Sequence, residues 1–265
     1  MRTIPQTELA VLRETAVDAA RKAATVLLNW VQRADEELGI MSKGDGSPVS
    51  KADFASHATI TALLEPLGFP ILSEEGLQQP WEERQHWDWF WLVDPLDGTE
   101  AFVRFREGFA VNIAFCGRQG PMIGVVADPC GGEIFSGLVG EGARRENLDG
   151  SAISKLRPNP PSPPYRLVTS RNEQAAIEAL LPPGIERHEV TLTPVSGALK
   201  FCLIAAGEAE IHSRTGAYME WDCAAGDGVL RSMGLDVRDR TTDRPLEYNK
   251  PSLWVHGLWT SRVQR

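Results

Sequence analysis

The feature that most constrains this chain is an apolar segment that ends on acidic residues. Trp89-Phe90-Trp91-Leu92-Val93 has the aromatic and β-branched composition of a buried strand, and the pattern stops at Asp94. The turn Asp94-Pro95-Leu96-Asp97-Gly98-Thr99 follows directly. Pro95 fixes its own φ angle and disfavours helical conformations at the preceding residue, so the turn is stiff. Gly98 lets a ligand approach the backbone closely. The segment therefore predicts a rigid turn that carries two carboxylates at the end of a buried strand.

Carboxylates of this kind point to a metal site. Two of them on a rigid turn, with a backbone carbonyl between them, suit a hard cation such as Mg²⁺ with phosphate oxygens completing its shell. Taken alone, Asp94 or Asp97 is explained equally well by a helix N-cap or an Asx-turn. However, Glu74 follows the apolar run Ile71-Leu72-Ser73 in the same way, and Asp222 lies at a predicted helix start. We expect these carboxylates to meet at one pole of a sheet, where their mutual repulsion requires cations.

Helix and strand patterns alternate along the whole chain, which predicts an α/β or mixed α+β fold. The expected helices cover 7–38, 51–67, 172–181, 197–206 and 222–233, and the expected strands cover 70–73, 89–93, 109–116, 121–127, 132–139, 166–169 and 209–212. Five prolines within 155–165 indicate a semi-rigid connector. We expect an N-terminal lobe over 1–155, with most of the metal ligands, and a C-terminal lobe over 156–265, with Asp222 and substrate-binding residues.

Composition excludes several classes of function. With 27 Lys and Arg against 36 Asp and Glu, the net charge of −9 argues against a nucleic-acid polymer as partner. No apolar stretch approaches the roughly 18 residues that a membrane span needs. The four cysteines show no CxxC spacing, so we expect buried thiols in a reducing compartment, by default the cytoplasm.

The motifs together resemble the inositol monophosphatase superfamily, and the flanking segments resemble its 3′(2′),5′-bisphosphate nucleotidase branch. Besides the turn at 94–99, the matching segments are Lys43-x-Asp45-x-Ser47-Pro48-Val49-Ser50-x-Ala52-Asp53, Leu72-Ser73-Glu74-Glu75, Leu199-Lys200-Phe201-Cys202-Leu203, Met219-Glu220-Trp221-Asp222-x-Ala224-Ala225 and Pro245-Leu246-x-Tyr248-Asn249-Lys250. The resemblance implies a layered α/β/α/β/α sandwich and a Mg²⁺-dependent, lithium-sensitive phosphatase. Its substrate would be 3′-phosphoadenosine 5′-phosphate, hydrolysed at the 3′-phosphate by a metal-activated water to give AMP and phosphate.

The resemblance also implies roles for individual residues. The matching metal ligands, for two or three Mg²⁺ ions, are Glu74, Asp94, Asp97, Asp222 and the carbonyl of Leu96. Asp94 would bridge two ions, and Glu74 would hold the ion nearer the nucleophilic water. Thr99 matches the hydroxyl that hydrogen-bonds this water, and Asp53 matches the carboxylate that pairs with that threonine. The backbone N–H groups of Gly98 and Thr99, at the start of the next helix, would cradle the phosphate.

A lysine and an arginine hold the uncleaved phosphate in this branch. Lys200 occupies the lysine position, and Arg214 lies fourteen residues further on, past the predicted strand at 209–212. The two side chains suit a dianion, although both could instead be surface cations with packed stems.

Three departures from the branch leave alternatives open. Gly197-Ala198 replaces two serines, Asn172 replaces a histidine, and Gly216-Ala217-Tyr218 replaces Gly-Pro-Thr. All are expected where the non-reacting part of the substrate binds. The substrate could therefore be an inositol, histidinol or other sugar-like monophosphate, and the protein could even be a non-catalytic phosphate-binding protein. A homodimer also stays open.

Overall fold

The computed structural model describes residues 3–44, 46–170 and 176–263, which form two large β-sheets, with helices between and outside them, and a separate two-stranded hairpin. The first sheet has the order β3-β4-β5-β6-β7-β8-β9. Its strands are β3 (Ile71–Ser73), β4 (Trp89–Asp97), β5 (Ala110–Gly117), β6 (Gly120–Asp128), β7 (Glu133–Leu138), β8 (Gly142–Asn147) and β9 (Ser154–Lys155). All neighbours are antiparallel except β3 and β4, which are parallel.

The second sheet has the order β11-β10-β12-β14-β13. Its strands are β10 (Tyr165–Thr169), β11 (Val190–Pro194), β12 (Ile211–Met219), β13 (Arg238–Asp239) and β14 (Trp254–Ser261). Strand β10 is parallel to both of its neighbours, whereas β14 is antiparallel to both of its own. The proline-rich connector lies between the end of the first sheet at Lys155 and the start of the second at Tyr165.

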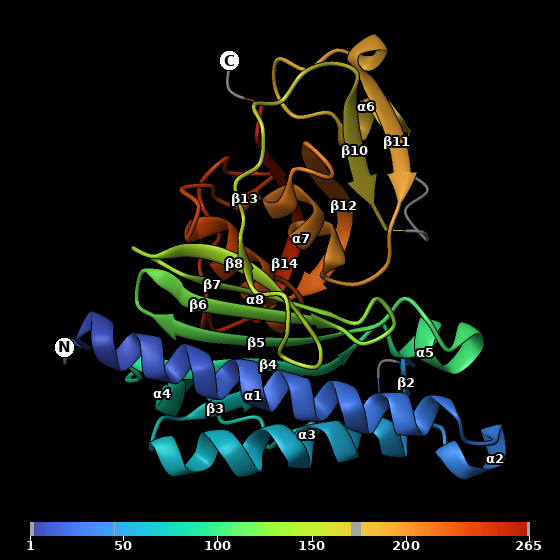
Figure 1. The fold of residues 1–265 in the computed structure, drawn as a ribbon, viewed down its shortest axis with the longest axis vertical. Helices are drawn as coiled ribbons and strands as arrows, with labels where there is room; N and C mark the ends of the chain where they lie inside the picture. The colour runs from blue at the N-terminus through green and yellow to red at the C-terminus, as the bar shows by residue number, and fades with distance from the viewer. Residues whose placement is uncertain (1–2, 45, 171–175, 264–265) are drawn as a thin grey trace.

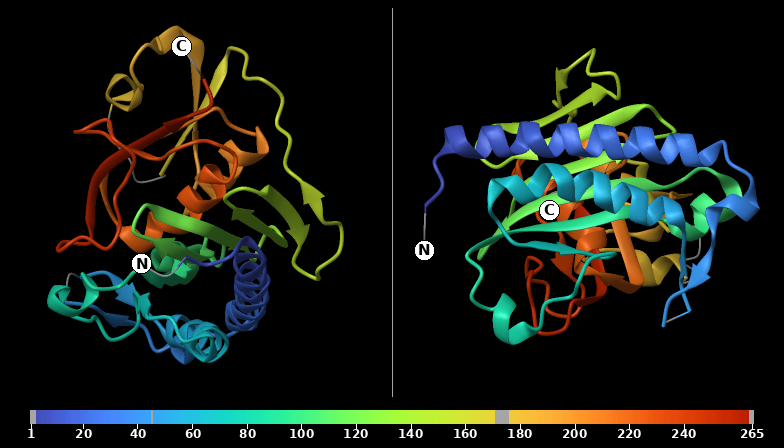
Figure 2. Two further views of the ribbon diagram at one scale, coloured as in Figure 1. Left: turned by 90° about the vertical axis from the view of Figure 1, so that its left-hand side faces the viewer. Right: turned by 90° about the horizontal axis from the view of Figure 1, so that it is seen from below.

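The helices complete a layered sandwich (Figures 1 and 2). Helices α1 (Gln6–Val31) and α3 (Lys51–Leu64) lie side by side on the outer face of the first sheet, while α7 (Leu199–Ala206) and α8 (Glu220–Arg231) lie between the sheets. Beyond the second sheet the outermost layer is reduced to α6 (Ile177–Leu180) and loops over a small apolar cluster. The predicted fold class is thus confirmed. Shorter elements are α2 (Asp35–Leu38), α4 (Trp81–Arg84), α5 (Thr99–Phe105), the 3₁₀ turns Glu65–Leu67 and Arg187–Glu189, and the hairpin of β1 (Met41–Ser42) and β2 (Pro48–Val49).

Glycines let α8 approach the first sheet closely enough to place its N-terminus beside the end of β4. A Cβ atom on Gly124 of β6 would lie 2.0 Å from the carbonyl oxygen of Ala225, and one on Gly228 would lie 2.7 Å from the nitrogen of Gly124. Both contacts are with backbone, which cannot move aside, so any larger residue would push α8 away from the sheet.

The first predicted helix ends earlier than expected. Instead of one helix over 7–38, α1 ends at Val31 and α2 begins at Asp35. Residues 32–37 are all exposed, so no apolar face holds them against the core. Asp35, Glu36 and Glu37 stand in the first turn of α2, where acidic side chains favour a helix start.

Several other boundaries were also wrong. Strand β4 does not stop at Asp94 but continues, with a bulge, to Asp97. Strand β12 begins at Ile211 and runs to Met219, beyond the predicted 209–212, so Arg214 lies within the strand and not past it. Helix α8 begins at Glu220, which places Asp222 in its first turn. Of the helix predicted over 172–181, residues 172–175 lie outside the described residues, and the described part is helical only over Ile177–Leu180.

Two further expectations concern membranes and thiols. No helix in the described ranges is both long and apolar enough to cross a membrane. All four cysteines are free thiols; Cys116, Cys202 and Cys223 are buried as expected, whereas Cys130 is exposed.

Candidate functional site

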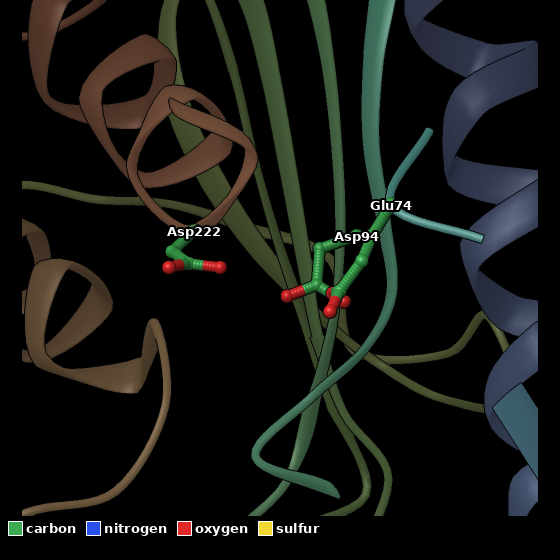
Figure 3. A group of neighbouring side chains, drawn as sticks. All are labelled: Glu74, Asp94 and Asp222. Atoms are coloured by element: carbon green, nitrogen blue, oxygen red, sulfur yellow. The ribbon is translucent and has the colours of Figure 1, made fainter. Parts of the chain in front are cut away.

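Three carboxylates from separate elements meet at one end of the first sheet. Glu74 follows β3, Asp94 lies on β4 and Asp222 lies on α8, and each offers an oxygen within 4.8 Å of the others. Figure 3 shows Asp222 extending from its helix toward the other two. Because β3 and β4 are parallel, their carboxyl ends share one edge, and the Glu74 N–H donates to the Val93 carbonyl (3.1 Å). The structure thus brings together three of the four predicted acidic ligands.

Local hydrogen bonds orient the side chains of Asp94 and Asp222. Asp94 Oδ1 accepts from the Leu96 N–H (3.0 Å), and Asp222 Oδ2 accepts from the Met219 N–H (2.8 Å). Asp94 thus forms the Asx-turn, whereas Asp222 is not the N-cap but the third residue of α8, and it accepts from the N–H of the N-cap residue, Met219. These hydrogen bonds involve one oxygen of each carboxylate.

Asp97 lies beside the three carboxylates. Its Oδ2 accepts hydrogen bonds from Asn112 Nδ2 (3.2 Å) and from the Ala198 N–H (2.5 Å). Asp97 is therefore not one of the three carboxylates whose oxygens lie closest together. It nevertheless lines the same cavity, of about 250 Å³. The residues around this cavity are Ser47, Pro48, Glu74, Asp94, Leu96, Asp97, Gly98, Thr99, Glu100 and Asp222.

The electrostatics of the cavity favour a bound cation. Burial and the neighbouring charges of Glu74, Asp97 and Asp222 raise the pKa of Asp94 well above its usual value. Burial beneath the surrounding elements, together with Asp97 and Glu74, likewise raises the pKa of Asp222 to about 8, although part of its surface faces the cavity. Both shifts reflect burial and the mutual repulsion of several carboxylates.

Lys43 supplies the positive charge that the sequence reasoning missed. Its Nζ lies 2.5 Å from Glu74 Oε1 and 2.5 Å from Glu75 Oε1. Burial opposes the charge on Lys43, but the hydrogen bonds that Lys43 donates to these two carboxylates outweigh this effect and raise the pKa of the lysine. The Lys43 ammonium group thus lies beside Glu74, where a metal cation would also be bound. With an all-oxygen set of carboxylates around it, the site fits a hard divalent ion such as Mg²⁺.

The predicted pair of Thr99 and Asp53 is formed. Thr99 Oγ1 lies 2.9 Å from Asp53 Oδ1 and 3.2 Å from the Leu96 carbonyl oxygen. Asp53 is buried, and its Oδ2 accepts from both the N–H (2.8 Å) and the Oγ (2.7 Å) of Ser50, the N-cap of α3. Burial raises the pKa of Asp53, and the hydrogen bonds from Ser50 and Thr99 partly offset this rise. Helix α3 therefore places one carboxylate against the hydroxyl at the start of α5.

A second cavity of about 230 Å³ adjoins the first and shares Asp97, Gly98 and Glu100 with it. Lys200 and Arg214 both line it, so the structure brings the two predicted cations to one site. The remaining lining residues are Ala101, Arg104, Phe105, Ser170, Ser196, Gly197 and Tyr218.

The two cations are held differently. Lys200 is 1% exposed, so it is not a surface cation, and its Nζ donates to the carbonyls of Gly197 (2.5 Å) and Val195 (3.4 Å). The Arg214 guanidinium lies 4.0 Å from the centroid of the Tyr218 ring, and its Nη1 donates to Ser170 Oγ (3.2 Å).

The sequence departures fall beside this second cavity. Gly197 and Tyr218 line it, and the N–H of Ala198 donates to Asp97. Asn172 lies outside the described residues.

The raised pKa of Asp222 predicts how the stability of the metal-free protein depends on pH. Between about pH 4 and 8, Asp222 keeps in the folded state a proton that the unfolded chain loses, so the metal-free protein becomes less stable as the pH rises toward 8. Divalent ions displace such protons, and their binding strengthens as the pH rises. We therefore expect the melting temperature in EDTA to fall from pH 6 to pH 8, and the increase caused by Mg²⁺ to be larger at pH 8. Differential scanning fluorimetry measures both.

Asp222→Asn is the matched variant for this test. It removes the titrating group, so the fall in EDTA should become shallower and the response to Mg²⁺ smaller. A wild-type protein equally stable at both pH values in EDTA would contradict the electrostatic assignment.

Comparisons with known proteins agree with this geometry. Residues 8–262 match the model of the inositol monophosphatase family. The 3′(2′),5′-bisphosphate nucleotidase CysQ of Shigella flexneri is 35% identical over 232 residues, covering 86% of this chain and 90% of that protein. The crystal structure of CysQ from Bacteroides thetaiotaomicron is 29% identical with a TM-score of 0.83, covering 96% of this chain and 98% of that one. Inositol monophosphatase from Anabaena, 23% identical with a TM-score of 0.69 and covering 96% and 91% of the two chains, shares the fold.

Proposed function

Because the chain belongs to the inositol monophosphatase family, we propose that it is a Mg²⁺-dependent phosphatase that hydrolyses the 3′-phosphate of 3′-phosphoadenosine 5′-phosphate to give AMP and phosphate. The observation that carries this proposal is the junction of two cavities. One is lined by carboxylates, the other contains Lys200 and Arg214, and Asp97 and Gly98 line both. A substrate with two phosphates can place one in each cavity.

Two or three Mg²⁺ ions would be held by Glu74, Asp94, Asp97, Asp222 and the carbonyl oxygen of Leu96. When bound, these ions would neutralise charge on the phosphate and activate a water molecule. Gly98 has φ +91°, and a Cβ there would lie 3.0 Å from the Gly108 carbonyl oxygen, so only glycine keeps this turn open to the phosphate.

Thr99 and Asp53 would orient the attacking water. When Thr99 Oγ1 donates its hydrogen to Asp53 Oδ1, its lone pairs are left to accept a hydrogen bond from a water molecule in the cavity. A proton leaving that water can pass to Thr99 as the threonine proton passes to Asp53. Because burial raises the pKa of Asp53, this carboxylate is a better proton acceptor than an exposed one.

Lys200 and Arg214 would hold the 5′-phosphate. The Lys200 ammonium group has three N–H donors, and the two backbone carbonyls leave one for a ligand. The Arg214 guanidinium is planar and stacked on Tyr218, which limits its motion. One point charge and one planar fork suit a phosphate dianion.

Single substitutions test this assignment. Lys200→Ala and Arg214→Ala should each raise KM for 3′-phosphoadenosine 5′-phosphate about ten- to hundred-fold, the equivalent of one charge-assisted hydrogen bond. Hydrolysis of inositol monophosphate, which has no second phosphate, should change little. Steady-state phosphate release measures both. Arg166→Ala is a suitable control, because Glu210 binds this arginine and it lines neither cavity.

Equal losses on both substrates, or a wild-type preference for inositol monophosphate, would remove the nucleotide assignment and leave a monophosphatase. No phosphate release from any substrate, with Mg²⁺ present, would favour a non-catalytic phosphate-binding protein.

Lithium inhibition is a further expected result. After turnover Asp97 and Asp222 would hold Li⁺ as well as Mg²⁺, and because Li⁺ supplies no divalent charge, product release would be delayed. We expect LiCl at tens of millimolar to lower the rate of phosphate release, whereas equal concentrations of KCl should not. Equal rates in the two salts would show that this family property does not extend to the chain.

We also propose a cytoplasmic location, since all four cysteines are free thiols.

A further inference from the structure

Asn112 is a buried residue beside the cluster of carboxylates. Neither the motifs nor the family resemblance assigned it a role. It lies on β5 directly opposite Asp94 of β4, and none of its surface is exposed. Its Nδ2 donates to Asp97 Oδ2 (3.2 Å). Its Oδ1 has no hydrogen-bond partner among the described residues.

The hydrogen bond from Asn112 completes a clamp on Asp97. Two N–H donors from different elements, Asn112 on β5 and the backbone of Ala198 before α7, converge on the same oxygen, Oδ2. Within the described ranges, no hydrogen bond reaches the other oxygen, Oδ1. The clamp thus fixes the carboxylate plane and leaves one oxygen for a ligand in the cavity that Asp97 lines.

We propose that Asn112 is a positioning residue, which holds Asp97 in the orientation that binds a divalent cation. The inference rests on the proposed metal assignment and extends it to a residue outside the ligand set. Partners of this kind, hydrogen-bonded to a ligand carboxylate, commonly change metal affinity about 10- to 100-fold when they are removed.

A purely structural role explains Asn112 less well. A buried acceptor without a partner costs free energy, and an apolar side chain of similar size would avoid that cost. The amide therefore has a disadvantage for stability in the metal-free protein. Among the described residues, the hydrogen bond to Asp97 is the one interaction of the Asn112 side chain that offsets this cost.

The experiment is direct Mg²⁺ titration without substrate. Isothermal titration calorimetry should show that Asn112→Leu and Asn112→Ala bind Mg²⁺ about 10- to 100-fold more weakly than wild type. For Asn112→Leu, the melting temperature in EDTA should stay near or above that of wild type, because the unpaired acceptor is gone. The Mg²⁺ concentration for half-maximal activity should rise by the same factor, and kcat at saturating Mg²⁺ should largely recover.

Ser136→Ala is the matched control. Ser136 is a fully buried polar residue of the same sheet, on β7, and its Oγ accepts from Arg144 Nε (3.1 Å) away from the cavities. It should lower stability without changing Mg²⁺ affinity. If either Asn112 variant is folded and binds Mg²⁺ as tightly as wild type, or if Ser136→Ala weakens binding equally, Asn112 does not position the ligand. A wild-type protein that binds no Mg²⁺ would overturn the metal assignment as well, so the two failures are distinguishable.

Discussion

Asp94→Asn should abolish nearly all activity and leave the fold intact. In the proposed site Asp94 would help to hold the Mg²⁺ ions, so its neutralisation would weaken their binding. A metal ion contributes several kcal/mol to transition-state stabilisation, and each tenfold in rate corresponds to about 1.4 kcal/mol. We therefore expect kcat to fall about a thousand-fold or more. Phosphate release at saturating Mg²⁺ measures this fall.

The same substitution should not destabilise the metal-free protein. Asp94 is buried among other carboxylates, which together with burial raise its pKa, so a neutral amide relieves repulsion. The melting temperature of the Asp94→Asn variant in EDTA should equal or exceed that of wild type. A value far below wild type, or retained activity, would contradict the assignment.

Asp227→Asn is the informative control. Asp227 is equally buried, but its charge is paired with Arg231 (2.8 Å) and it accepts from the Tyr248 hydroxyl (2.9 Å). Its neutralisation should lower the free energy of unfolding by about 1–3 kcal/mol and leave the activity of the folded molecules nearly unchanged. Two buried aspartates should therefore respond in opposite ways, because the charge of Asp227 has a partner in the chain and that of Asp94 is proposed to bind a metal.

The proposed acidic ligands could be predicted from sequence because Glu74 and Asp94 follow apolar runs and Asp222 lies at a helix start. Glu74 directly follows β3, and Asp94 lies on the parallel strand β4 next to Val93, the last residue paired with β3, a placement that a linear pattern suggests directly. Asp222 comes from a helix far along the chain, and it arrives there because Gly124 and Gly228 allow α8 to lie close against β6. That close approach depends on tertiary packing, which no local pattern predicts.

Residues that act through long-range contacts were missed for the same reason. Lys43 lies in a turn-rich segment, and only the fold places it between Glu74 and Glu75. In the sequence, Asn112 is one polar residue in an apolar strand. Only the strand register shows that it lies opposite Asp94. No periodic pattern marks either residue as part of the site.

The second sheet was harder to predict than the first. Strand β11 is mostly exposed and short of apolar residues, and β12 changes from buried to alternating burial after Ser213. Such strands are stabilised by their neighbours more than by their own composition. The predicted strand therefore ended before Arg214, although the proximity of Arg214 to Lys200 was correctly anticipated.

Thr99→Val should lower kcat about 10²- to 10⁴-fold, the usual contribution of a group that assists proton transfer. Valine keeps the β-branched shape at the start of α5 but lacks the hydroxyl that bridges Asp53 and the cavity. KM should change little, because the substitution leaves Lys200 and Arg214 in place. Steady-state kinetics at saturating Mg²⁺ measure both parameters.

A double-mutant cycle with Asp53→Asn separates a relay from two independent effects. If Thr99 acts only through its hydrogen bond to Asp53, the double variant should be no slower than the slower single variant, because the second substitution removes a step that is already broken. Multiplied losses would mean that the two residues act separately. Ser56→Ala is the structural control: Ser56 lies on the same helix, α3, and donates to the Pro95 carbonyl (2.6 Å) of the same turn. If it lowered kcat as much as Thr99→Val does, the loss would come from movement of the turn and not from the missing hydroxyl.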